Sequence, residues 1–175
     1  GLTRKPDHVE TYNNLGTVLK NQNRFDEAIA NYKRAISLKP DYAEAYYNLA
    51  NSYRGQRRLD DALENYCKAI DSNPMHVEAL NNLGVTLKEQ GRLDEALLIH
   101  NRVIRLRPDY AEAHNNNGIV LQELGMLREA LKAFDKAIVS KPDYAEAHFN
   151  RSMALLLAAQ FDEAWPEYEW RLRTK

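Results

Sequence analysis

The chain has 175 residues, a formal net charge of −1 and a single cysteine, Cys67. A nearly neutral charge gives no overall field that would attract nucleic acid or an anionic membrane, so neither is an expected partner. One cysteine excludes an intramolecular disulfide, and no apolar run is long enough to cross a bilayer, so we expect a cytoplasmic protein.

Five prolines divide the chain at a constant interval of 34 residues: Pro6, Pro40, Pro74, Pro108 and Pro142. A fixed period of this size is typical of stacked helical repeats. We therefore expect an all-α solenoid in which each repeat packs on its neighbours. The expected divisions are a lead-in over residues 1–8, repeats over 9–42, 43–76, 77–110 and 111–144, and a partial, atypical repeat over 145–175.

Each repeat is expected to begin with an amphipathic first helix. In repeat two the apolar residues Tyr46, Leu49, Ala50 and Tyr53 have the i, i+3, i+4, i+7 spacing of one helix face. An aspartate three residues before a glutamate resembles a capping box and predicts the start of this helix. These aspartates are Asp7, Asp41, Asp109 and Asp143, while repeat three has Met75 at the same place.

A turn and a second helix complete each repeat. Gly91, Gly125 and Asn23 favour the left-handed conformation that ends a helix, whereas Arg57 and Ala159 do not, so we expect those two turns to differ. The second helix is expected to be capped by aspartates in four repeats, namely Asp26, Asp60, Asp94 and Asp162.

These units resemble tetratricopeptide repeats. The match is carried by Leu-Gly in the first helix, at Leu15-Gly16 and Leu83-Gly84, and by the spacing Ala28, Tyr32, Ala35 and Ala130, Phe134, Ala137 in the second. The resemblance covers nearly the whole chain. It implies a right-handed superhelix whose first helices line a concave face.

An asparagine occurs at the sixth position of every repeat, on the side of the first helix opposite the core pattern. These residues are Asn14, Asn48, Asn82, Asn116 and Asn150. Asparagine is a mediocre helix former, and the surface needs no asparagine for stability, so we favour a binding role. The alternatives are a solvated face or an inherited residue without a role.

A primary amide can pair with both the C=O and the N–H of an extended peptide. The five asparagines therefore predict a ladder that holds a peptide by its backbone. Such a ladder is similar to that of the superhelical arm of O-linked N-acetylglucosamine transferases and their Spindly-like relatives, which implies substrate recognition. Further candidate contacts flank the ladder: Lys20, Arg54 and Lys88 as a basic edge, and Tyr47, Asn51 and Phe149.

The sequence predicts no catalytic centre, metal site or cofactor. The five histidines lack dense ligand spacing, and no nucleophile, base and oxyanion donor come together. We therefore expect this chain to be non-catalytic.

The last repeat departs from the others. Trp165-Pro166-Glu167-Tyr168-Glu169-Trp170-Arg171 resembles the segment at which bacterial tetratricopeptide arrays give way to a glycosyltransferase domain. We expect Pro166 at or near a first helical turn, where proline is tolerated. An apolar end containing Trp165, Trp170 and Leu156 would favour a homodimer, unless the tryptophans pack within their own repeat.

The leading hypothesis is a scaffold that binds an extended peptide or protein segment, as the substrate-recognition part of a larger protein. The alternatives are a self-association module acting through its C-terminal end, or the non-catalytic arm of a glycosyltransferase. Because the chain opens at Gly1 without a methionine, we interpret it as a fragment or as a chain from which a tag was cleaved.

Overall fold

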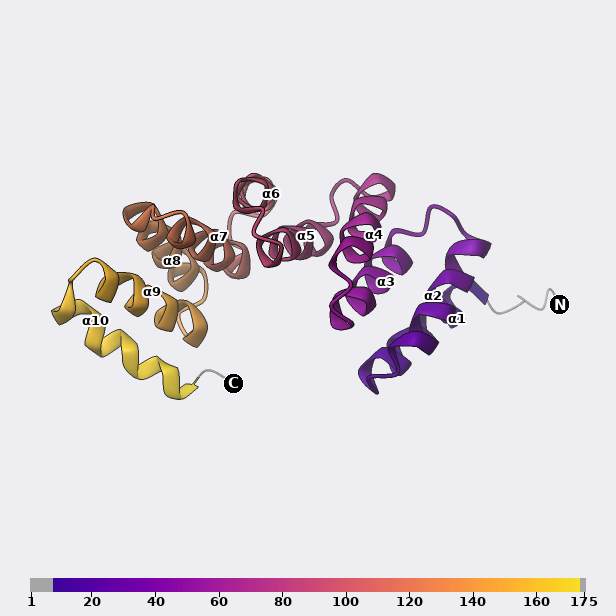
Figure 1. Cartoon of the computed structure of the whole chain (residues 1–175), viewed down its shortest axis with the longest axis horizontal. Helices are drawn as coiled ribbons and strands as arrows, with labels where there is room; N and C mark the ends of the chain where they lie inside the picture. The colour runs from indigo at the N-terminus through magenta and orange to yellow at the C-terminus, as the bar shows by residue number, and fades with distance from the viewer. Residues whose placement is uncertain (1–7, 174–175) are drawn as a thin grey trace. The chain divides into compact units, whose positions relative to one another are not determined.

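A computed structural model describes residues 8–173 (Figure 1). Over this range the chain forms ten α-helices and a short 3-10 helix, which confirms the all-α prediction. They are α1 (His8–Asn21), α2 (Phe25–Leu38), α3 (Ala43–Gly55), α4 (Leu59–Ser72), α5 (Val77–Glu89), α6 (Leu93–Leu106), α7 (Ala111–Glu123), α8 (Leu127–Ser140), α9 (Ala145–Leu157), α10 (Phe161–Tyr168) and η1 (Glu169–Arg173). The predicted lead-in, apart from His8, and the predicted cap Asp7 lie outside the described residues.

The helices pack in pairs joined by short turns. α1 packs on α2, α3 on α4, α7 on α8 and α9 on α10. Glycine on the first helix permits the close approach: a Cβ at Gly16 would lie 2.6 Å from the Tyr32 ring, and one at Gly118 would lie 2.6 Å from the Phe134 ring. At Gly16 and Gly118, an aromatic ring of the second helix therefore lies on the backbone of the first.

The chain divides within α5 into two compact units, unit 1 up to Thr86 and unit 2 from Leu87 onward. In unit 1, α2 packs on α3, and α1 also touches α3. In unit 2, α6 packs on α7, α8 packs on α9, and α7 touches α9. Each unit thus has its own core, with Tyr32 and Tyr66 fully buried in unit 1 and Phe134 in unit 2.

The predicted aspartate caps that fall on described residues are wrong. The N-cap residues of the first helices are Tyr42, Tyr110 and Tyr144, none with a side-chain capping hydrogen bond. The second helices begin after Arg24, Arg58, Arg92 and Gln160, again without one. Within residues 8–173, each predicted aspartate lies one residue before the N-cap or at the second helical position, where its charge still favours the helix dipole.

All five turns within the repeats contain a residue with positive φ. Gly91 (76°), Gly125 (77°) and Asn23 (60°) confirm the prediction. Arg57 (62°) and Ala159 (57°) adopt the same conformation, so the expectation that their turns differ is wrong. The common closing bond explains this: Arg58 N–H donates to the Tyr53 carbonyl at 3.0 Å, and its counterparts do the same in the other repeats.

The C-terminal helix also departs from expectation. Pro166 lies inside α10 and not in its first turn. Proline donates no backbone hydrogen bond to the fourth residue before it, and the chain passes from α10 into η1 after Tyr168. Among the described residues, none of the helices is both long and apolar enough to cross a membrane.

Candidate functional site

The five predicted ladder asparagines differ in exposure. In unit 1, Asn14 on α1 is exposed, Asn48 on α3 is only 7% exposed, and Asn82 on α5 is half-buried. In unit 2, Asn116 on α7 and Asn150 on α9 are both half-buried. All five lie on first helices, as the sequence predicts.

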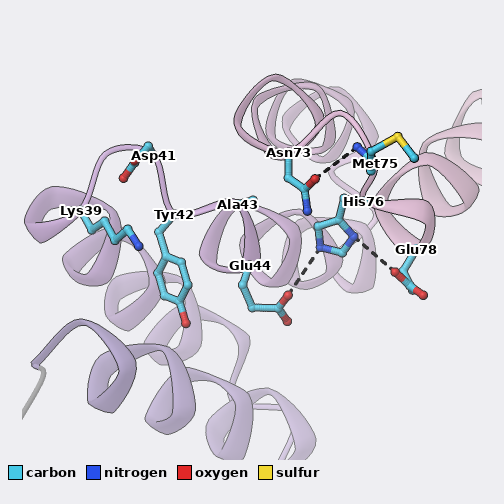
Figure 2. A pocket seen from close by; sticks show the side chains of 9 residues that line it. All are labelled: Lys39, Asp41, Tyr42, Ala43, Glu44, Asn73, Met75, His76 and Glu78. Atoms are coloured by element: carbon cyan, nitrogen blue, oxygen red, sulfur yellow. Dashed lines mark hydrogen bonds and ion pairs between the residues drawn. The ribbon is translucent and has the colours of Figure 1, made fainter.

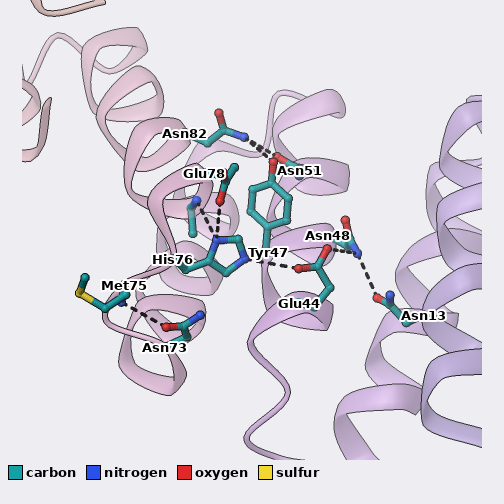
Figure 3. A network of polar contacts seen from close by, with 11 residues as sticks. Asn13, Glu44, Tyr47, Asn48, Asn51, Asn73, Met75, His76, Glu78 and Asn82 are labelled. Atoms are coloured by element: carbon teal, nitrogen blue, oxygen red, sulfur yellow. Dashed lines mark hydrogen bonds and ion pairs between the residues drawn. The ribbon is translucent and has the colours of Figure 1, made fainter. Parts of the chain in front are cut away.

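In unit 1 the amides bond to one another between successive repeats (Figure 3). The Nδ2 of Asn48 donates to Asn13 Oδ1 at 3.0 Å. The Nδ2 of Asn82 donates to Asn51 Oδ1 at 3.0 Å and to Tyr47 Oη at 3.3 Å. The hydroxyl of Tyr66 donates to the same Asn51 oxygen at 2.6 Å, so Asn51 is a structural acceptor.

Unit 2 repeats this arrangement. The Nδ2 of Asn150 donates to Asn115 Oδ1 at 3.0 Å. Asn115 is 1% exposed, and within the described residues its own Nδ2 has no hydrogen-bond partner. The buried, unpaired Nδ2 of Asn115 costs free energy of folding. The hydrogen bond that its Oδ1 accepts from Asn150 satisfies the other polar atom of the same side chain.

These bonds correct one premise of the sequence analysis, that the surface needs no asparagine. Asn48, Asn82 and Asn150 each donate across a repeat boundary, and they therefore contribute to stacking. Figure 3 shows the Oδ1 atoms of Asn48 and Asn82 pointing away from these bonds. Asn48 and Asn82 thus offer a ligand an acceptor, and not a donor–acceptor pair, because each Nδ2 already donates to two acceptors.

The predicted flanking residues are also engaged in the scaffold. The Tyr47 ring lies 4.9 Å from the ring of His76, and Phe149 lies 5.9 Å from Tyr168. Lys88 pairs with Glu123 at 3.5 Å. Lys20 and Arg54 are half-buried on α1 and α3.

A hollow of about 440 Å³ is lined by the segments that lead into α3 and α5, over residues 39–44 and 73–78 (Figure 2). His76 stands at its edge, 3.5 Å from Glu44 and 3.4 Å from Glu78. The hydrogen bond to Glu44 raises the pKa of His76, and the same bond lowers the pKa of Glu44. Glu44 also accepts from Asn48 at 3.4 Å, which joins the hollow to the amide network.

The hydrogen-bond partners of the ladder asparagines were not predicted from the sequence. Asn13 and Asn115 precede a ladder asparagine by one residue, and they serve the asparagine of the following repeat. The Asn-Asn doublets at 13–14 and 115–116 were the available signal. The Glu44–His76 pair was not predicted because the recurring glutamate was read as a cap.

At the C-terminal end, the three residues predicted to mediate self-association differ in exposure and packing. Trp165 is 56% exposed, whereas Leu156 is half-buried. Trp170 stacks on His148 with ring centroids 4.0 Å apart and planes 5° apart. Trp170 thus packs within its own repeat, which is the alternative that the sequence left open.

The histidines serve the scaffold. His114 Nε2 lies 2.8 Å from the Pro108 carbonyl, and His148 Nε2 lies 2.9 Å from that of Pro142. His100 is fully buried on α6, where Tyr32, Tyr66 and Phe134 stand in other repeats. No group of three or more potential metal ligands occurs among residues 8–173.

Comparison with known proteins identifies the family. A family model described as tetratricopeptide repeat matches residues 47–111 and 115–169, and another described as TPR repeat matches residues 16–56. The chain belongs to the tetratricopeptide repeat family. It is therefore a protein-interaction module of that family. A search of curated proteins finds no match.

Several solved tetratricopeptide structures are similar to this chain. A crystal structure of MamA is 26% identical with a TM-score of 0.80, covering 90% of this chain and 92% of MamA. YrrB, described as a TPR protein with an unusual peptide-binding site, is 26% identical with a TM-score of 0.73, covering 91% of this chain and 82% of YrrB. PilF of Pseudomonas aeruginosa, 22% identical with a TM-score of 0.87 and coverages of 95% and 76%, shows the fold alone.

Proposed function

We propose that this tetratricopeptide chain holds an extended peptide or protein segment against its first helices, through the carbonyl oxygens of the ladder asparagines. The observation that supports this is the direction of the amides: the Nδ2 atoms of Asn48 and Asn82 are used within the fold, and their Oδ1 atoms point away (Figure 3). The likeness to YrrB supports a peptide as the ligand.

An acceptor ladder selects donors. A peptide backbone offers one N–H per residue, so each asparagine takes one hydrogen bond from the ligand irrespective of its side chains. Packed helices lie about 8–10 Å apart and an extended chain advances about 3.3–3.6 Å per residue, so contacts recur at about every third residue. The recognised segment is extended with a three-residue period, as in a polyproline II helix, so that every third N–H faces the protein.

Asn14 is the position at which a substitution can test peptide binding without affecting the stability of the fold. It is exposed on α1, unlike the buried Asn48. Its replacement by alanine should leave the unfolding midpoint unchanged and lower the affinity for a 12-residue peptide selected from a random-sequence array. Asn48→Ala is no suitable test, because it also breaks the bond to Asn13.

Backbone N-methylation of the same peptide tests whether its N–H groups donate the hydrogen bonds to the asparagines. Methylation at every third residue, in the register that faces the protein, should reduce the affinity at least tenfold in calorimetry. Methylation in the other two registers is the control. If all three registers bind alike and Asn14→Ala binds like the wild type, the proposal is ruled out.

We further propose that the chain is the substrate-recognition part of a larger protein, and one alternative is that it is the non-catalytic arm of a glycosyltransferase. The resemblance of residues 165–171 to the junction in bacterial tetratricopeptide glycosyltransferases supports this. The sequence of the full-length gene tests it directly, and a coding region that contains no transferase domain would contradict it.

Self-association through the C-terminal end is the alternative function, and the 56% exposure of Trp165 favours it. Light scattering should then show a mass that rises with concentration. Trp165→Ala should abolish the rise, and Trp170→Ala is no clean control because Trp170 packs on His148.

A further inference from the structure

A second hollow, of about 180 Å³, lies in unit 2, where α6 and α8 both pack on α7. It is smaller than the sites of about 300–1,000 Å³ that hold drug-sized ligands, so it has room for one side chain or a small group. Ile104, Leu121 and Ala133 give it an apolar wall. His114 of α7 also lines the hollow, and this side chain is only 4% exposed.

One ring nitrogen of His114 is anchored, and the other has no partner. Nε2 lies 2.8 Å from the Pro108 carbonyl, which only accepts hydrogen bonds, so Nε2 carries a proton. Within residues 8–173, no group forms a hydrogen bond with Nδ1. Polar atoms of side chains this deeply buried are normally paired, so the unpaired Nδ1 indicates a missing ligand.

The equivalent histidine one repeat later shows which group completes the ring. His148 Nε2 lies 2.9 Å from the Pro142 carbonyl, as its counterpart does in repeat four. The Nδ1 of His148 lies 2.5 Å from a carboxylate oxygen of Glu167, with a proton between the two atoms. The indole of Trp170 stacks on the same ring at 4.0 Å. In repeat five, a glutamate of the chain itself is therefore the partner of the histidine.

Repeat four lacks both of these side chains. Ala133 stands at the position of Glu167, and Lys136 stands at the position of Trp170. Ala133 and Lys136 both line the hollow. The hollow therefore lies where a carboxylate and an indole surround the histidine in repeat five.

The charges around the hollow favour a carboxylate as the missing group. In repeat five, Arg151 supplies positive charge 3.4 Å from Glu167. Repeat four has a neutral asparagine in place of this arginine, and two lysines of α8, Lys132 and Lys136, line the hollow instead. Glu129 adds one negative charge, so the described lining keeps an excess of one positive charge.

We infer that this hollow binds one carboxylate on a short apolar stem, the glutamate side chain of a partner protein, with His114 Nδ1 donating to the carboxylate. The charged groups that face His114 across the hollow are Glu129, Lys132 and Lys136 of α8, whereas α6 contributes the neutral Asn101 and Ile104. A glutamate is ionised near neutral pH, so the second ring proton comes from solution. Binding therefore takes up a proton and strengthens as the pH falls.

The probe is N-acetyl-L-glutamate methylamide, and N-acetyl-L-glutamine methylamide is the matched neutral control. Nuclear magnetic resonance of the full chain follows the backbone amide of Leu121 and the ring of His114, which both line the hollow. We expect saturable binding of the glutamate probe in the millimolar range, and at least tenfold weaker binding of the glutamine probe. Raising the pH from 6 to 8 should weaken glutamate binding at least tenfold.

Two substitutions test the residues. Ala133→Glu recreates the arrangement of Glu167, so its His114 ring signals should lie, without any probe, where those of the probe-bound wild type lie; Ala133→Gln is the uncharged control. His114→Leu should abolish binding of the glutamate probe. The fold accepts this change, because Leu80 is fully buried at the same position of repeat three.

The inference is overturned by absence of saturable binding, by equal binding of the two probes, by binding that survives His114→Leu, or by an affinity independent of pH. Binding of butyrate without binding of the glutamate probe would assign the hollow to a free carboxylic acid and overturn the partner protein as its source. None of these results depends on the asparagine ladder, so they are separate from the test of the proposed function.

Discussion

Asn48 is buried on α3 and donates to Asn13 Oδ1 across a repeat boundary. Removing the Asn48 amide leaves the buried Asn13 oxygen without this donor. An unsatisfied buried polar group costs about 1–3 kcal/mol. We expect Asn48→Ala to lower the free energy of unfolding by about 1–2 kcal/mol, measured by urea denaturation.

Asn14→Ala is the matched control for this prediction. It has the same repeat position on α1, but its side chain is exposed. Alanine is the better helix former by about half a kcal/mol, so this variant should be neutral or slightly more stable. Equal destabilisation by the two substitutions would contradict a structural role for the Asn48 bond.

His100 presents the opposite situation, a buried polar ring with no hydrogen bond at either nitrogen among the described residues. Burial lowers its pKa from 6.5 to about 4. The unfolded chain therefore binds the proton more tightly. The stability that His100 contributes is complete above pH 6.5 and is lost as the pH falls towards 4, by on the order of 3 kcal/mol.

His100→Phe should remove this acid sensitivity. Phe134 is fully buried at the same position of repeat four, so the fold accepts a phenyl ring there. We expect the wild type and the variant to differ more at pH 4.5 than at pH 7.5 in urea denaturation, with the variant favoured in acid. A difference independent of pH would show that His100 does not titrate on unfolding.

At the scale of the element, Ala159 ends α9 with a φ of 57°, a conformation in which a Cβ is strained. Ala159→Gly should therefore stabilise the chain by about 1 kcal/mol. Gly125→Ala, at φ 77° in the turn after α7, is the reciprocal variant and should destabilise by a similar amount. Thermal unfolding measures both, and a loss of stability in Ala159→Gly would contradict the strain.

The same turns show what the sequence could and could not predict. The period and the amphipathic pattern identified ten helices, because both depend on spacing that five copies repeat. The conformation of Arg57 and Ala159 was not predicted from residue preference, since the requirement to reverse the chain between paired helices outweighs it. The caps failed for a related reason: Asp41 matches a capping pattern, but the helix begins after Tyr42.

At the scale of the whole molecule, the helices that carry the asparagines were predictable, and the burial and bonding of these side chains were not. Helical periodicity placed Asn48 and Asn82 on first helices, but the structure leaves Asn48 only 7% exposed. Their acceptors, Asn13 and Asn51, belong to the preceding repeat, and only the stacking distance between helices decides whether two amides meet. Sequence spacing carries no such distance, so a binding role and a stacking role looked the same.

The two units should respond to pH in opposite directions. In unit 1, His76 faces Glu44, Glu78 and the Tyr47 ring, and its pKa is raised. Its contribution to stability is therefore complete below the unfolded value of about 6.5 and is lost as the pH rises through the folded pKa. In unit 2, burial lowers the pKa of His100, and the charge of Lys88 lowers it further, which makes acid destabilising.

Hydrogen exchange, normalised to unstructured rates, can follow both units in one sample. Between pH 5 and pH 8, protection of the first turn of α5 should fall while protection of α6 rises. His76→Gln should abolish the first change only, and His100→Phe the second only. The two changes should be separable because each histidine acts on the repeat interface that surrounds it. If both segments change in the same direction and neither variant separates them, the opposite pKa shifts do not control local stability.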